Sequence, residues 1–184
     1  MNFSKMNIFL CLLMVLSINL VLAQQEMTTP KSAYEMFLSD FGTMITKDYF
    51  DMPKLESSYK KISVKIIRLS SGKGIQYFLS FSAKSEYSNK TAVIAQDDLK
   101  EISKALTTII EKSKNESTQN IEYRESYFST NDGFKVGYFQ KGLKQTFFID
   151  LDDYQSDDTF FFDNFESLQK SIDEVKSKIN ALSN

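Results

Sequence analysis

The aspartates between positions 150 and 163 are the densest group of side chains in this sequence that could do chemistry. They are Asp150, Asp152, Asp153, Asp157, Asp158 and Asp163. Carboxylates are hard oxygen ligands, and calcium takes about six to eight of them. The run nevertheless has Gln155 where an EF-hand loop needs glycine, and Phe161 where it needs its terminal glutamate. We therefore expect a solvated acidic loop, and the alternative is a calcium site formed by the first five of these aspartates.

The composition excludes several kinds of catalytic and metal site. The chain has no histidine, and its single cysteine, Cys11, lies in an apolar segment near the N-terminus. Without either residue elsewhere, a Ser-His or Cys-His nucleophile is excluded, and so is zinc held by imidazole or thiolate. No glycine stands in a strand-to-helix phosphate loop. We expect no catalytic residue, no cofactor, and no metal apart from the acidic alternative.

The first 23 residues predict an export signal. Lys5 lies in a short polar start, and residues 8–22 form an apolar run that is too short for an ordinary membrane span. Val21 and Ala23 suit the two subsites of signal peptidase, which predicts cleavage before Gln24. The alternative is an uncleaved N-terminal anchor. We expect a secreted or periplasmic protein with no stable membrane span after cleavage.

Length and charge limit what the cleaved chain can be. The signal holds one of the 22 basic residues and none of the 24 acidic ones, so the remaining 161 residues carry a net charge of −3. This length suits one domain, which can bury roughly two-thirds of its unfolded surface and needs no disulfide. A net acidic chain argues against strong binding to nucleic acid.

The polar residues 24–31 predict a flexible lead, and a single domain is expected over 32–184. Ser32 and Glu35 have the spacing of a capping box, and apolar residues follow at helical intervals. This pattern predicts a helix over 32–47.

Two units of similar element order are predicted after a break at Pro53. Alternating residues on both sides of a turn predict a hairpin between 62 and 81, and a helix over 97–113 follows, capped by Asp97 or Asp98. Beyond a linker at 114–120, strand-like segments at 121–129, 134–140, 143–151 and 159–162 precede a final helix capped by Asp163.

These units predict a tandem repeat of a β-meander followed by a helix. The half-repeats cover about 59–113 and 121–182, their helices align at a constant offset of 66 residues, and the second unit has an extra strand at 143–151. The alternative is that apolar patterning alone makes any two such segments align. We expect an α+β fold: an antiparallel sheet from two β-meander-plus-helix halves, with helices packed on one face and an extra N-terminal helix.

Pairs of adjacent aromatic residues predict rings on both faces of the strands. Because neighbouring residues of a strand face opposite ways, one ring of each pair points away from the helices. The candidates for an interaction patch are Tyr127, Phe139, Phe148 and Phe160. If such rings cluster in the open, they mark an interface. The alternative is that the N-terminal helix covers them or that they are scattered singly.

The sequence resembles known proteins in two respects, its composition and the order of its predicted strands and helices. The segment LVLAQQ, with a composition rich in Lys, Asn, Ile and Ser and without His or Trp, resembles small secreted proteins of Bacteroidota-type bacteria. The doubled β-meander-plus-helix is similar to the Whirly and PUR group of single-strand nucleic-acid binders, which implies a topology. Their basic sheet is only partly matched, by Lys65, Arg68, Lys73, Arg124, Lys135 and Lys141. We do not carry over their binding activity, because fold does not imply function.

Three hypotheses about function follow. The leading one is an exported, non-catalytic binding or interaction module whose partner is an unknown protein or small ligand, or a second copy of the chain in a homodimer. The second is a carboxylate- or calcium-dependent hydrolase, which requires acidic residues that meet in a cleft. The third is a single-strand nucleic-acid binder, which requires the basic residues of both hairpins on one sheet face. No nucleic-acid partner is expected.

Overall fold

The structure, a computed structural model, describes residues 31–84, 89–151 and 159–183. The chain divides after Lys31, and the fold described below is that of the unit beginning at Ser32. The predicted export signal lies outside the described residues. So do four of the acidic candidates, namely Asp152, Asp153, Asp157 and Asp158.

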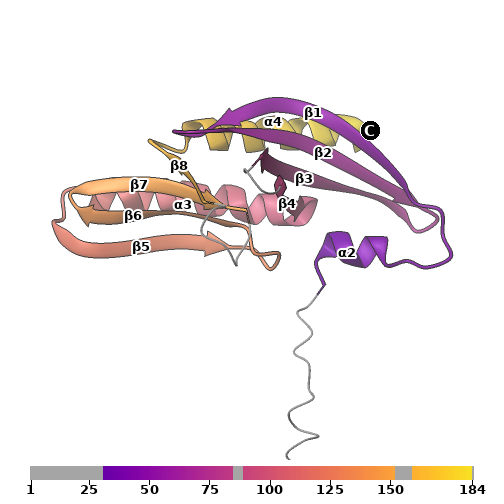
Figure 1. Cartoon of the computed structure of the whole chain (residues 1–184), viewed down its shortest axis with the longest axis horizontal. Coiled ribbons are helices and arrows are strands. Elements are labelled where there is room, and N and C mark those ends of the chain that lie inside the picture. The colour runs from indigo at the N-terminus through magenta and orange to yellow at the C-terminus, as the bar shows by residue number, and fades with distance from the viewer. Residues whose placement is uncertain (1–30, 85–88, 152–158, 184) are drawn as a thin grey trace, which may run out of the picture. The chain divides into compact units, whose positions relative to one another are not determined.

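The unit contains two antiparallel four-stranded sheets, each followed by a helix (Figure 1). The first half consists of α2 (Ala33–Leu38), β1 (Thr46–Glu56), β2 (Lys61–Ser71), β3 (Gly74–Lys84), β4 (Asn89–Ala95) and α3 (Gln96–Glu116). The second half consists of β5 (Ile121–Ser129), β6 (Lys135–Gly142), β7 (Lys144–Asp150), β8 (Thr159–Phe162) and α4 (Glu166–Ser183). Strands β1 to β4 form sheet A and β5 to β8 form sheet B, each in sequence order. The α+β fold of two β-meander-plus-helix halves is confirmed.

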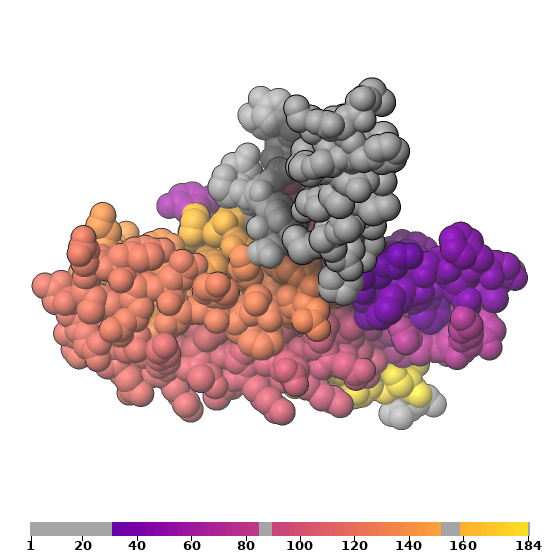
Figure 2. Space-filling model, turned by 90° about the horizontal axis from the view of Figure 1, so that it is seen from below, coloured from indigo at the N-terminus to yellow at the C-terminus, as the bar shows by residue number. Residues whose placement is uncertain are grey.

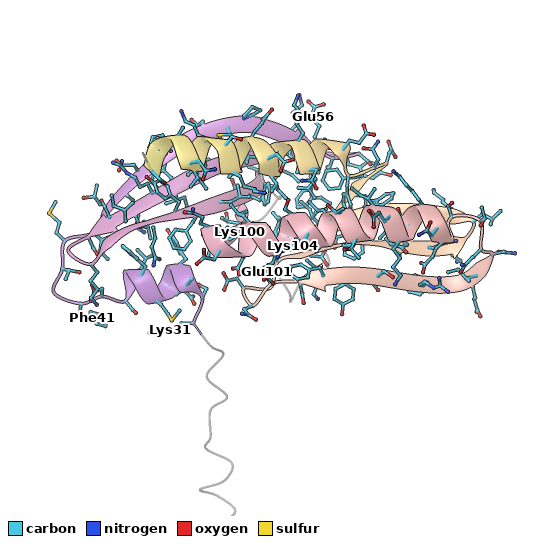
Figure 3. The ribbon with its side chains drawn as sticks, turned by 180° about the vertical axis from the view of Figure 1, so that it is seen from behind. Lys31, Phe41, Glu56, Lys100, Glu101 and Lys104 are labelled. Carbon is cyan, nitrogen blue, oxygen red and sulfur yellow. The ribbon has the colours of Figure 1, made fainter. Side chains whose placement is uncertain are left out.

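Both long helices lie on the inner side of the sheets and share one core. Helix α3 contacts β3 and β4 of sheet A, β5 and β6 of sheet B, and α4. Seen from behind, α3 and α4 lie side by side in front of the strands (Figure 3). The stripe of α3 that faces this core consists of Leu99, Ile102, Leu106 and Ile109, all at most 6 % exposed. One hydrophobic cluster therefore joins the two halves.

The first helix is shorter than the predicted 32–47, and a strand occupies part of that range. The capping box of Ser32 and Glu35 is present, as predicted, but α2 ends at Leu38. Gly42 then adopts a φ of +82°, a left-handed conformation that favours glycine and turns the chain. Strand β1 follows, and it contains Pro53 within a register shift between Met52 and Leu55. An edge strand tolerates proline at such a bulge.

Because β1 is a strand, the two halves contain the same number of strands. The prediction gave the second half an extra strand at 143–151, whereas each half has four strands followed by one long helix, and α2 precedes the first half's strands. The buried positions of the helices agree with the offset of 66 residues, since Ile102 and Leu168 are both fully buried. A common origin of the two halves stays a prediction.

The starts of the two long helices differ from the predicted caps. Ala95 occupies the N-cap of α3 without a side-chain bond, and Asp97 and Asp98 lie in the first turn. There they favour the helix through its dipole rather than by capping. Before α4, the side chain of Asn164 accepts from the backbone N–H of Glu166 at 3.0 Å, so Asn164 takes the role predicted for Asp163.

Glutamine side chains of sheet B satisfy the carbonyls at the end of α3. The last carbonyls of a helix have no partner within it and need one when they are buried. Gln140 is fully buried, and its Nε2 lies 3.3, 2.6 and 3.0 Å from the carbonyl oxygens of Glu116, Gln119 and Gly142, so its two N–H groups are shared among three acceptors. Gln145 Nε2 donates to the carbonyl of Ser113 at 2.9 Å and to Gln140 Oε1 at 3.0 Å. We call these two glutamines, with Glu116, Arg124 and Tyr138, the α3 clasp.

The charged part of the α3 clasp is centred on Glu116. The Tyr138 hydroxyl donates to Glu116 Oε2, and Arg124 Nη1 lies 3.0 Å from Glu116 Oε1. The bond from Tyr138, together with the Arg124 charge, lowers the pKa of the Glu116 carboxyl below its ordinary 4.5, although burial acts in the opposite direction. Burial and the bond to Glu116 raise the pKa of Tyr138 to about 12.

Removal of the Gln140 side chain is expected to destabilise the fold. Gln140→Ala removes a buried donor and leaves the partly buried carbonyls of Glu116, Gln119 and Gly142 without it, which costs about 2–3 kcal/mol of unfolding free energy. Urea unfolding followed by circular dichroism measures this loss. The matched control is Gln76→Ala, an exposed glutamine on β3, which should change the stability by less than about 0.5 kcal/mol. Equal effects of the two substitutions would contradict the role of the α3 clasp.

The contribution of Glu116 to stability should depend on pH. Because folding lowers its pKa, ionised Glu116 stabilises the fold fully above about pH 4.5, and this stabilisation is lost as the pH falls through the lowered value. The difference in unfolding free energy between the wild type and Glu116→Gln should therefore be largest near neutral pH and shrink below about pH 4.5. Glu101→Gln, at an exposed glutamate of the same helix labelled in Figure 3, serves as the control. A difference that stays constant down to pH 3 would exclude this coupling.

Candidate interaction surface

The outer face of sheet B carries a group of aromatic rings on the side opposite α3. Alternation along β6 and β7 places Tyr138 and Phe147 against the core and Phe139 and Phe148 on the other side. The aromatic face consists of Tyr123, Tyr127, Phe139, Phe148 and Phe161. In Figure 1 this face is turned toward the viewer, and α3 lies behind the strands.

Phe139 is the centre of the aromatic face. Its ring centroid lies 6.2 Å from that of Tyr123, 6.4 Å from that of Phe148 and 6.2 Å from that of Phe161. Tyr123 is 60 % exposed, and Phe139 and Phe161 are half-buried. These centroid distances lie within the range of about 4.5–7 Å in which aromatic rings attract one another. Four adjacent strands therefore hold one continuous aromatic group, part of it in contact with solvent.

Tyr127 extends the aromatic face along β5 and depends on a glycine opposite it. Tyr127 is 54 % exposed and pairs across the strands with Gly137, and Lys135 Nζ lies 5.6 Å from its ring centroid. A Cβ on Gly137 would lie 2.5 Å from Tyr127 Cβ and would also clash with the Ser126 carbonyl. The absence of a side chain at Gly137 thus lets β5 approach β6 closely at this rung. The side of the molecule seen in Figure 2 shows β5 in salmon beside α3 in pink.

Sheet A differs from sheet B because a helix covers its outer face. Ile67, Leu69 and Phe78 are buried there beneath α2, and the rings of Tyr34 and Phe78 meet edge to face at 5.3 Å. The alternative in which the N-terminal helix covers the outward rings thus applies to sheet A. Among the described elements, helix α3 contacts sheet B, and it does so from the inner side.

Of the four residues predicted to form an interaction patch, three lie on the aromatic face and one lies in the core. Tyr127 and Phe139 lie on the aromatic face, and Phe148 lies there too but is only 4 % exposed. Phe160 belongs to the inner core and is 5 % exposed, because alternation along β8 turns Phe160 and Phe162 inward and Phe161 outward. Sequence reasoning missed Tyr123 and Phe161. Steps of two residues along β5 from Tyr127 would have found Tyr123. Phe161 could not be found in this way, because its orientation depends on how β8 pairs with β7.

The acidic candidates form no metal site within the residues that the structure describes. No group of three or more acidic side chains there could hold an ion. Asp150, the one described member of the predicted calcium ligands, is half-buried, and its Oδ1 accepts no hydrogen bond. A calcium site therefore stays a prediction about a segment outside the described residues.

The basic residues do not line one sheet face. Lys65, Arg68, Lys73 and Arg124 form ion pairs with Asp51, Asp48, Asp40 and Glu116, at distances of 2.6 to 3.0 Å. Arg124 belongs to the inner α3 clasp, whereas Lys135 and Lys141 alternate onto the outer face of sheet B. This arrangement gives no support to the single-strand nucleic-acid hypothesis.

A long groove follows α4 beside β1. Its volume is about 1090 Å³, and Met52 and Pro53 of β1 and Ile110 of α3 contribute its apolar part. The α4 side presents Glu166, Lys170, Asp173, Glu174 and Lys178, which are of both signs. The mixed charges define no single ligand chemistry.

No protein-family model matches the chain, and no curated protein or solved structure is significantly similar to it. Within the described residues, no helix combines the length and the apolar character that a membrane crossing requires. The functional conclusion therefore depends on the geometry of the surface itself.

Substitution of Gly137 is expected to disturb the aromatic face and the fold together. Gly137→Ala places a methyl group against β5, and overpacking of this kind costs about 1–3 kcal/mol. Thermal unfolding measures the loss. The matched control is Gly72→Ala in the β2–β3 turn, where an added Cβ meets nothing within 4 Å. An equal change at the two glycines would contradict the close approach of β5 to β6.

Proposed function

We propose that this chain is an exported, non-catalytic binding module and that the aromatic face of sheet B is its binding surface. The observation that carries this proposal is the difference between the two outer faces. Buried aliphatic and aromatic residues of sheet A have α2 as their cover, whereas Tyr123 and Tyr127 of sheet B are more than half exposed. Exposed aromatic clusters commonly mark sites of interaction.

The chemical character of the face supports binding rather than reaction. Tyrosine and phenylalanine contribute large contact areas at a low cost in side-chain entropy, and such anchors provide much of the energy in known interfaces. Glu125 accepts from the Tyr123 hydroxyl at 3.2 Å, so a polar group accompanies the exposed ring. The residue types outside the export signal offer no histidine or cysteine for nucleophilic chemistry. Export is supported by the apolar run and the short side chains before Gln24.

Site-specific photocrosslinking in the native host tests the proposed surface. A photoreactive p-benzoylphenylalanine replaces Tyr123, and the adducts found in the medium, the cell envelope and the cytoplasm are each separated by mass. We expect a discrete adduct from position 123, which disappears when Phe139→Ser is added, because Phe139 supports the Tyr123 ring.

The matched control is the same replacement at Tyr49, a tyrosine on β1 of sheet A that is 56 % exposed. Position 49 should give no adduct of that mass. Equal labelling from positions 49 and 123, or no adduct from 123, would overturn the proposal that sheet B binds the partner. An adduct confined to the cytoplasm would overturn the export part.

A further inference from the structure

Strand β8 is too short to cover β7, and a hollow lies where its continuation would run. β7 spans seven residues, but β8 pairs only with Phe147 to Asp150. Within the described residues, no strand pairs with Lys144, Gln145 and Thr146 on the β8 side. A hollow of about 250 Å³ occupies this position, and all three residues line it. We call this hollow the β7 notch.

The walls of the β7 notch come from both halves of the chain. Ser58 in the β1–β2 turn donates its backbone N–H to the Phe161 carbonyl at 2.8 Å, which brings Tyr59 to the rim. Tyr59 is 83 % exposed. Phe139 and Phe161 line the notch from the aromatic face. An occupant would therefore find backbone groups on one side and aromatic rings around it.

The two ends of the β7 notch carry opposite charges. Asp163 lines the end where β8 stops, and Lys144 lines the other end, with Lys141 directly across from Lys144 in the register of β6 and β7. The open stretch of β7 between these ends consists of Thr146, Gln145 and Lys144, a length of about 10 Å in an extended strand. Within the described part of the chain, none of these three charged groups forms an ion pair. The direction from Asp163 to the lysines is the direction in which β8 runs.

We propose that the β7 notch binds the C-terminal residues of an extended peptide, which adds to β7 as an antiparallel strand in line with β8. The last three residues of the peptide lie opposite Thr146, Gln145 and Lys144, and its free α-carboxylate lies beside Lys144 and Lys141. The residue before them turns away from β7, because Phe162 already pairs with Phe147, and its basic side chain lies beside Asp163. An unpaired strand edge supplies the main-chain bonds of such β-augmentation, and flanking side chains supply the specificity. This inference rests on the proposed function, because Phe139 and Phe161 belong to both surfaces, and it names the class of partner.

The register also predicts the side chains of the peptide. Thr146 pairs with Phe139 and faces outward, so the peptide residue opposite Thr146 packs beside the Phe139 ring. The residue opposite Gln145 faces inward, where Gln145 already bonds to Ser113 and Gln140, and it must be small. The last residue lies opposite Lys144. A suitable probe is the tetrapeptide Lys-Tyr-Ser-Val with a free C-terminus.

Titration of the isotope-labelled protein with this probe, followed by NMR, tests the inference. Shifts of the backbone amides of Lys144, Gln145 and Thr146 are expected, together with slower hydrogen exchange at Gln145. Lys141 and Lys144 close a two-residue turn and bond to each other, so alternation along the strand directs the Gln145 N–H to the open side, where it gains a partner. The same peptide with a C-terminal amide should bind about tenfold more weakly, because it lacks the charge that the lysines recognise. Equal binding of acid and amide, or shifts elsewhere only, would overturn the proposal.

Charge reversal provides the matched pair of variants. Lys144→Glu should weaken binding of the free acid by about tenfold or more, whereas Lys104→Glu, at an exposed lysine of α3 labelled in Figure 3, should leave it unchanged. Both lysines are exposed, so both variants are expected to fold, and circular dichroism checks this. Equal effects would contradict the assignment. If the peptide fails to bind while crosslinking from position 123 persists, the peptide assignment is wrong and the aromatic face remains a binding surface. Loss of both results rejects both proposals.

Discussion

The whole unit depends on the sharing of α3 by the two sheets. A four-stranded meander has one apolar inner face and needs a cover, and α3 provides part of that cover for both sheets at once. The apolar stripe of α3, from Leu99 to Ile109, packs into the common core. Each fully buried apolar side chain in it contributes about 1.5–3 kcal/mol to the stability of the fold. At the other end, Gln140 and Gln145 satisfy carbonyls that would otherwise be buried without donors. Hydrophobic and polar contacts thus hold the same helix at its opposite ends.

Sharing α3 and α4 on the inner side leaves the two outer faces to be covered separately. Sheet A has α2, whose Tyr34 packs on Phe78, and sheet B has its own cluster of rings around Phe139. In the described residues the fold therefore uses three helices for four sheet faces. The face without a helix is also the face that adjoins the β7 notch. The exposed aromatic face is in this sense a consequence of how the core is built.

Element type and order were largely predictable from the sequence, because alternation and helical spacing are strong along most of the domain. The capping box of Ser32 and Glu35 and the strands β5 and β8 lie where the pattern placed them. Strand β1 was missed because Pro53 and several charges mask its alternation, and its stability comes from pairing with β2 and from contact with α4, which lies far away in the sequence. Phe160 was wrongly expected at the surface, because the sequence does not show which residues of β8 face inward. Pairing with β7 decides this. The β7 notch involves residues from both halves, and a single sequence does not place those residues together.

The proline and the bulge in β1 have a consequence beyond the geometry of sheet A. β1 is an edge strand of 11 residues, long enough to pair with the edge of another molecule and begin an ordered aggregate. Pro53 cannot donate a hydrogen bond, the register shift after Met52 interrupts the regular row of donors, and Lys47, Asp51 and Lys54 place charges along the edge. This edge is thereby made unsuitable for fibril growth. The longest edge strand of sheet A is thus protected against strand addition, whereas the open part of β7 in sheet B is only three residues long.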